Sequence, residues 1–200
     1  MSDFRSAVAA AAEHVRAAPA RLGGVRFVAV DGPSGSGKST FADLLISRLS
    51  APRAPGDADP GPVRLIRTDD FATWDEPVEW WPRLRDGVLE PLRAGRAGSY
   101  RRTEWPGGRP VLGARVDVAV PRILVLEGVS AARAAAAPDL STAVWVEVAE
   151  SLRLERAVAR DGEGSRRELR RWQHFEREWF AADRTRARAD VRARPDGPLD

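Results

Sequence analysis

Short runs of apolar and β-branched residues alternate along the chain with longer segments in which apolar residues recur at helical spacing. The runs predict buried strands, because strands of a parallel sheet are covered on both faces and read as continuous apolar stretches. These strands are expected at residues 25–30, 63–67, 123–126 and 143–148, with an edge strand at 189–194. Strands that alternate with helices indicate an α/β fold, in which helices cover both faces of a parallel sheet.

The segments of helical spacing lie mainly between these strands. Helices are expected at residues 1–19, 38–49, 76–92, 130–137, 151–160 and 166–182. We expect Pro82 to interrupt the third of these, because proline lacks a backbone N–H and clashes with the preceding turn. Between residues 95 and 120, Pro106-Gly107-Gly108 predicts the turn of a hairpin.

The length and composition of the chain bound its class. Its 200 residues are 43% hydrophobic and 30% charged, which predicts one globular domain with a sizeable core. No apolar run is long enough to cross a bilayer, so we expect no membrane partner. The absence of cysteine excludes a disulfide framework and thiolate metal sites, and it fits a reducing cytoplasm, the expected location.

Lysine occurs once among the 32 lysine and arginine residues of the chain. This residue, Lys38, lies in a segment that fits the phosphate-binding pattern G-x-x-x-x-G-K-[ST]. A compact ammonium fits between phosphate oxygens where a planar guanidinium does not. A chance match in a Gly/Ser-rich loop is the alternative, but a predicted strand precedes the segment and a predicted helix follows it, as the pattern requires. We therefore expect a nucleotide to be bound by Gly32, Pro33, Ser34, Gly35, Ser36, Gly37, Lys38, Ser39 and Thr40.

Acidic residues follow two further strands, at the edge of the sheet where ligands bind in α/β folds. Asp69 and Asp70 follow the second predicted strand, and Glu127 follows the third. Oxygen ligands suit Mg²⁺, so Ser39, Asp69 and Glu127 are the expected metal ligands. One of the two aspartates is also expected to accept the proton of an attacking hydroxyl. Helix capping or a turn is the alternative role for these acids.

Arg153, Arg156 and Arg160 recur at helical spacing before a glycine-containing turn at 161–164. Three arginines on one helical face suit a lid that closes on phosphates and neutralises the transferred charge. We expect this lid at about residues 151–170, and an ion-paired surface helix is the alternative. Acidic residues interleave with the arginines of the C-terminal part, so we expect no nucleic-acid partner.

Aromatic residues gather between residues 71 and 105. The group consists of Phe71, Trp74, Trp80, Trp81, Tyr100 and Trp105. Their faces could sandwich a planar substrate, and packing of the core is the alternative. Three further tryptophans, Trp145, Trp172 and Trp179, are expected in the core.

Taken together, the ordered motifs resemble the uridine kinase family of P-loop small-molecule kinases. The matching segments are VAVDGPSGSGKSTFADLL, IRTDDF, LVLEGV, RLERAVARD and RARADV, and they span about residues 25–194. The resemblance implies a P-loop NTPase fold, a parallel sheet flanked by helices, with a small acceptor-binding insertion at about 71–120 and an arginine-rich lid. It also implies ATP or GTP as donor, Mg²⁺, and transfer to the 5′-hydroxyl of uridine or cytidine.

By position, Asp69 matches the catalytic aspartate of that family, Glu127 its metal-associated glutamate, and Arg156 and Arg160 its lid arginines. The segment 99–105 departs from the family, because it has no histidine to contact the base. This departure concerns the acceptor pocket and leaves the phosphate-binding residues intact.

We therefore expect an ATP-dependent kinase that transfers a γ-phosphoryl group to a hydroxyl of a small molecule, with a pyrimidine nucleoside as the first candidate. The expected catalytic residues are Asp69, Lys38, Arg156 and Arg160, and the expected substrate-binding residues are Asp69, Asp70, Phe71, Trp74 and Tyr100. A kinase for another small alcohol and a nucleotide-binding regulatory module without an acceptor are the alternatives. The sequence leaves open which molecule is the acceptor and whether ATP or GTP is the donor. It also leaves open which of Asp69 and Asp70 is the base, and whether the protein forms a homo-oligomer.

Overall fold

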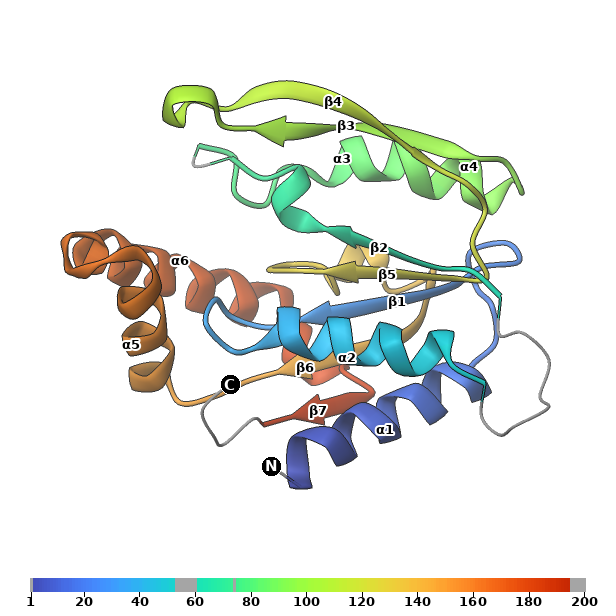
Figure 1. Cartoon of the computed structure of the whole chain (residues 1–200), viewed down its shortest axis with the longest axis horizontal. Helices are drawn as coiled ribbons and strands as arrows, with labels where there is room; N and C mark the ends of the chain where they lie inside the picture. The colour runs from blue at the N-terminus through green and yellow to red at the C-terminus, as the bar shows by residue number, and fades with distance from the viewer. Residues whose placement is uncertain (1, 53–60, 74, 195–200) are drawn as a thin grey trace.

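The strands of the main sheet run parallel, as the apolar runs of the sequence predict (Figure 1). The computed structural model describes residues 2–52, 61–73 and 75–194. The sheet has five strands in the order β2-β5-β1-β6-β7, and every pairing is parallel. The strands are β1 (Arg26–Asp31), β2 (Val63–Arg67), β5 (Ile123–Glu127), β6 (Leu140–Val146) and β7 (Val191–Ala193). The last of them forms an edge of the sheet, as expected.

Alternate residues of β1 point to opposite faces of the sheet, and both faces are covered. Val28 and Val30 belong to a core that includes residues of α1 (Ser2–Ala17) and α2 (Lys38–Ser50). Phe27 and Ala29 belong to a second core on the other face, which residues of the 71–120 segment complete. Burial on both faces explains why the inner strands β1 and β5 are apolar along most of their length.

The 71–120 segment lies between β2 and β5 in sequence and folds into a helical stretch and a hairpin. The helical stretch runs through α3 (Trp81–Leu84), a π-helical turn (Arg85–Leu89) and α4 (Glu90–Arg93). The hairpin pairs β3 (Gly98–Glu104) with β4 (Val111–Val118) in antiparallel register. Glycine is needed where the two parts meet, because a Cβ on Gly87 would lie 2.5 Å from the carbonyl oxygen of Ser99.

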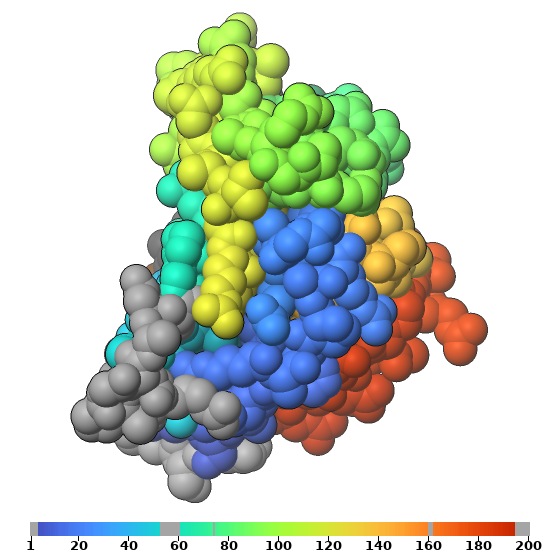
Figure 2. Space-filling view, turned by 90° about the vertical axis from the view of Figure 1, so that its right-hand side faces the viewer, coloured from blue at the N-terminus to red at the C-terminus, as the bar shows by residue number. Residues whose placement is uncertain are grey.

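The same segment rests on the turn that precedes β1. In Figure 2 its residues, coloured green to yellow, lie above the blue residues of the N-terminal part. Gly23 in this turn has a φ of 57°, and a Cβ there would lie 2.6 Å from the carbonyl oxygen of Arg93 at the end of α4. Only glycine permits both the backbone angle and this close approach.

Two further helices, α5 (Glu150–Asp161) and α6 (Arg166–Asp183), lie beyond the carboxyl ends of the strands (Figure 1). Arg133, which follows β5, joins α6 to the 71–120 segment. Its guanidinium carbon lies 4.5 Å from the ring centroid of Trp80 and 5.7 Å from that of Trp179 in α6. Across the described residues, no helix combines the length and the hydropathy that a bilayer crossing needs.

Two predicted helices are wrong in extent. The helix predicted at 76–92 starts later, with Pro82 in its first turn, where the missing N–H has no helical partner to lose. Pro82 therefore lies in the first turn of this helix and does not interrupt it. Of the helix predicted at 130–137, only a short 3₁₀ turn at Ala134–Ala136 forms, because Ser130 adopts a φ of 67°, outside the right-handed helical region.

Candidate active site

The phosphate loop joins β1 to α2 and is shaped by its glycines. Gly35 and Gly37 have φ angles of 78° and 90°, in the left-handed region that favours glycine. Gly32 is required for space, since a Cβ there would lie 2.1 Å from the carbonyl oxygen of Val146 in β6. α2 begins at Lys38, so the unpaired N–H groups of its first turn and their partial positive charge face the loop. The loop therefore offers a site for an anionic phosphate.

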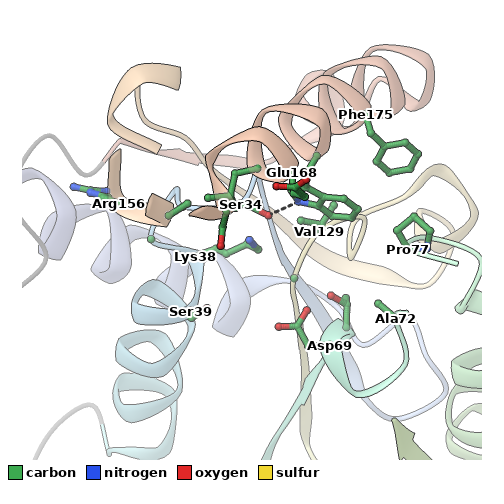
Figure 3. Close-up of a pocket in the computed structure, with 18 of the residues that line it drawn as sticks. Ser34, Lys38, Ser39, Asp69, Ala72, Pro77, Val129, Arg156, Glu168 and Phe175 are labelled. Carbon is green, nitrogen blue, oxygen red and sulfur yellow. Dashed lines mark hydrogen bonds between the residues drawn. The ribbon is translucent and has the colours of Figure 1, made fainter. Parts of the chain in front are cut away.

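A cleft of about 1930 Å³ opens over this loop, beyond the carboxyl ends of the strands (Figure 3). It is lined by the loop, the turn after β2, the end of β5, and parts of α5 and α6. The site residues predicted from the sequence that line it are Ser34, Gly35, Gly37, Lys38, Ser39, Thr40, Asp69, Glu127 and Arg156. Gly32, Pro33 and Ser36, also predicted, are buried in the loop itself.

Asp69 and Glu127 meet in the cleft because β2 and β5 are neighbours, with Arg67 opposite Glu127 in the register. The Ser39 hydroxyl donates a hydrogen bond to Glu127 Oε1 over 3.1 Å, and Arg67 Nε lies 3.3 Å from Glu127 Oε2. Burial raises the pKa of Glu127; Lys38 opposes this rise, and the negative charge of Asp69 adds to it. A cation near these two carboxylates would lower their repulsion.

Magnesium fits the oxygen atoms at this place. In kinases Mg²⁺ binds one or two carboxylates and completes its octahedron with substrate phosphate oxygens and water. Ser39, Asp69 and Glu127 supply a hydroxyl and two carboxylates, and the repulsion between the carboxylates favours a cation there. Among the residues that the structure describes, no cluster of three His, Cys, Asp or Glu side chains could hold a metal ion by itself. Phosphate oxygens of a bound nucleotide would therefore have to complete the site.

Asp31, at the end of β1, belongs to this region and was not predicted. Its buried carboxylate accepts hydrogen bonds from the backbone N–H groups of Gly32 (2.7 Å), Ser130 (3.0 Å) and Ala132 (2.8 Å). Burial raises the pKa of Asp31 to about 7, although the three hydrogen bonds and the charge of Lys38 oppose this rise. Asp31 thereby fixes the start of the phosphate loop to the segment that follows β5. A lone acid between an apolar strand and the loop was the signal for it in the sequence.

The predicted lid arginines do not share one environment. Arg156 lines the cleft, on the side of Lys38 opposite to Asp69 in Figure 3. Arg160 belongs to α5, and its side chain lies outside the described part of the structure. Arg153 is wrong as a lid residue, because α6 packs over it: it is buried, with Nη1 3.4 Å from Glu176 Oε2.

α6 contacts the phosphate loop directly through Ser34. Its buried Glu176 accepts hydrogen bonds from the backbone N–H of Ser34 over 2.9 Å and from the Ser34 hydroxyl over 2.5 Å. Trp172 Nε1 donates to the same hydroxyl over 2.8 Å. The prediction that Trp172 belongs to the core is wrong, since it is half-buried and lines the cleft with Phe175. The sequence signal for this part of the cleft was a pair of aromatic residues, three residues apart on one predicted helix.

The aromatic residues expected to bind substrate lie elsewhere. Phe71 and Tyr100 are buried, with ring centroids 4.6 Å apart, because the hairpin packs over Phe71. The Tyr100 hydroxyl donates to Asp70 Oδ2 over 2.6 Å, and Arg102 donates to Asp70 Oδ1 over 3.1 Å. The predicted substrate-binding residues Asp70, Phe71 and Tyr100 therefore contact one another and do not line the cleft. Trp74 lies outside the described residues.

A phosphate loop after a central strand of a parallel sheet, with helices beyond the strand ends, is the arrangement of P-loop kinases. No protein-family model matches the chain, and no curated protein matches its sequence. Solved structures do match, along nearly the whole chain.

One of these is a "possible uridine kinase" from Bacillus stearothermophilus, at a TM-score of 0.67 and 19% identity, covering 96% of this chain and 100% of that chain. Another is a "putative fructose transport system kinase" from Silicibacter sp. TM1040, at a TM-score of 0.57 and 20% identity, covering 94% of this chain and 97% of that chain. At such identities the likeness shows the fold. The predicted α/β fold is confirmed, and the chain is structurally similar to uridine kinase-like P-loop kinases.

Proposed function

We propose that this protein is a kinase that transfers the γ-phosphoryl group of ATP or GTP, with Mg²⁺, to a hydroxyl of a small molecule. The observation that supports this most is the meeting of Lys38, Ser39, Asp69 and Glu127 in one cleft. A phosphate loop alone serves many nucleotide-binding proteins, whereas a carboxylate beside the loop suits transfer to an alcohol. The structural similarity to a "possible uridine kinase" supports a pyrimidine nucleoside, uridine or cytidine, as the first acceptor to test.

Binding of the donor follows from the loop. Its backbone N–H groups and the Lys38 ammonium would hold the β- and γ-phosphates at the start of α2. Ser39, Asp69 and Glu127 would hold Mg²⁺, which supplies positive charge against the phosphate oxygens. Arg156, from the opposite side of the cleft, and Arg160 would add positive charge to the phosphate site as α5 closes on it.

Transfer then requires a base near the acceptor. The Asp69 carboxylate accepts the proton of the acceptor hydroxyl, whose oxygen forms a bond to the γ-phosphorus. The bond from that phosphorus to the bridging oxygen breaks, and ADP leaves with its electron pair. Lys38 and the arginines stabilise the negative charge that spreads over the transferred group.

The test compares Asp69→Asn with Asp70→Asn in an assay of ADP release, with Mg·ATP and a panel of uridine, cytidine and small sugars. Asp69→Asn is expected to lower kcat roughly 100-fold or more, because the base is lost. Asp70→Asn is the matched control: its carboxylate is engaged by Tyr100 and Arg102, so kcat should fall less than about tenfold. Equal losses in both variants would remove Asp69 from the proposed role. A protein that binds ATP but releases no ADP with any acceptor would be a nucleotide-binding module.

A further inference from the structure

The acceptor hydroxyl has to approach Asp69, so the walls of the cleft on that side decide which molecule fits. Figure 3 shows Ala72 and Pro77 on the same side of Lys38 as Asp69, with Phe175 of α6 facing them across the cleft. Trp172, one turn before Phe175, also lines the cleft. Apolar and aromatic walls of this kind bind a ligand mainly through contact area.

The two aromatic side chains of α6 form a stacked pair, whose exposed parts make an aromatic surface in the cleft. The rings of Trp172 and Phe175 are stacked, with centroids 5.3 Å apart and an angle of 27° between their planes. Both are half-buried, so part of each ring is open to the cleft. A planar ring can lie against such a surface in offset or edge contact, whereas a flexible polyol gains little from it.

Hydrogen bonds at Ser34 of the phosphate loop fix the orientation of the Trp172 ring. Trp172 Nε1 donates to the Ser34 hydroxyl over 2.8 Å, and the same hydroxyl donates to the buried Glu176 over 2.5 Å. The indole is therefore held before any ligand arrives, which lowers the entropy lost on binding. Of the other aromatic candidates, Phe71 and Tyr100 are buried in the core, whereas Trp105 of the hairpin also lines the cleft.

We infer that Trp172 and Phe175 form the wall that receives a planar conjugated ring of the acceptor, with Pro77 on the facing side. This inference rests on the proposed kinase function and adds which residues determine specificity. The hydroxyl of such a molecule would point to Asp69 while its ring lies along α6. Ring-bearing alcohols would then be better acceptors than ringless or saturated polyols of similar size.

Two matched pairs of variants test the wall. Phe175→Leu removes a ring from the wall, whereas Phe180→Leu removes a ring of the same helix that packs on Trp145, with centroids 4.7 Å apart. Trp172→Leu and Trp172→Phe both lose the N–H bonded to Ser34, but only the first loses the ring. We would measure the Kd of uridine by calorimetry in the presence of Mg·ADP, and the KM values of uridine and fructose for ADP release with Mg·ATP.

The expected result is a Kd and KM for uridine raised about three- to tenfold in Phe175→Leu, and in Trp172→Leu relative to Trp172→Phe, the size of one aromatic contact. Phe180→Leu should match the wild type, and the KM of fructose should show no such rise in any variant. Circular dichroism of all four variants would show whether each is folded. If Phe175→Leu does not fold, the Trp172 pair decides by itself.

The possible outcomes distinguish a failure of the aromatic-wall inference from a failure of the kinase proposal. Uridine binding that is equal in all variants, or absent in the wild type, overturns the wall. A wild type that phosphorylates fructose but binds no uridine also overturns the wall and leaves the kinase intact. Uridine binding that weakens in Phe175→Leu and Trp172→Leu but not in Phe180→Leu supports the wall, even if no acceptor is phosphorylated and the kinase proposal fails.

Discussion

The carboxylate of Asp31 lies inside the protein at the start of the phosphate loop, where three backbone N–H groups converge on it. Its surroundings shift its pKa in two opposite directions. Burial disfavours the ionised form, while the hydrogen bonds and the charge of Lys38 favour it. Burial dominates and leaves the pKa at about 7. At the residue scale, a group that holds the loop in place can therefore change its charge near neutral pH.

A dependence of stability on pH follows. The pKa of Asp31 rises from 3.8, the ordinary value expected in the unfolded chain, to about 7 in the folded protein. Between these values the folded protein keeps a proton that the unfolded chain has lost, so the contribution of Asp31 to the free energy of unfolding falls as pH rises from about 4 to 7. The side chain in Asp31→Asn cannot ionise, so the free energy of unfolding of this variant should lack this fall with pH.

Urea unfolding at about pH 4 and about pH 8 measures the slope in both proteins. Asp117→Asn is the control. The side chain of Asp117 on β4 is 77% exposed, so this variant should keep the wild-type slope. An Asp31→Asn protein whose stability changes with pH as steeply as that of the wild type would contradict the assignment.

At the element scale, α6 has two roles that its own sequence shows only as an amphipathic pattern. Glu176 lies on the same side of the helix as Trp172 of the aromatic wall, four residues further on, and is buried against Ser34 of the phosphate loop and Arg153 of α5. The helix therefore links the loop, α5 and the acceptor side of the cleft. Loss of the Glu176 charge should weaken this link.

Glu176→Gln should lower the free energy of unfolding by about 3 kcal/mol, because Arg153 stays buried without its opposite charge. The amide oxygen can still accept from Ser34, so the change isolates the ion pair. Glu178→Gln, on the same helix with a side chain that is 70% exposed, should change stability by less than about 0.5 kcal/mol. Urea unfolding of the three proteins checks this, and equal losses in the two variants would show that the pair stabilises nothing specific.

At the scale of the whole molecule, the chain has one lysine among its 32 lysine and arginine residues, so an amine-directed reagent can label the phosphate site selectively. Amine-directed acylation can reach only Lys38 and the α-amine of the chain. Because Lys38 would lie against the phosphates of a bound nucleotide, Mg·ATP should slow its acylation and leave the α-amine unaffected.

Intact and peptide masses after timed acylation, with and without Mg·ATP, give the two rates. Protein unfolded in urea, where no site exists, should lose the protection. Acylation of Lys38 at one rate in all conditions would mean that nucleotide phosphates do not bind at the loop.

The fold and the donor half of the site follow largely from local sequence. The five strands of the main sheet form close to where apolar runs predict them, and the loop and α2 follow β1 as the phosphate-binding pattern requires. Such features depend on neighbours within a few residues. Pro82 and Ser130 were the local exceptions: Pro82 lies in the first turn of its helix, and Ser130, whose backbone N–H donates to the distant Asp31, lies outside the right-handed helical region.

What the sequence by itself determined was therefore the order of elements, the phosphate loop with Lys38, and the acids that end two strands. Only the tertiary structure decided that β2 and β5 are neighbours, which brings Asp69 and Glu127 together. It also decided that Phe71 is buried while Phe175 faces the cleft. The physical reason is range: periodicity and turn chemistry act between adjacent residues, whereas the burial of a side chain depends on which distant segments pack against it.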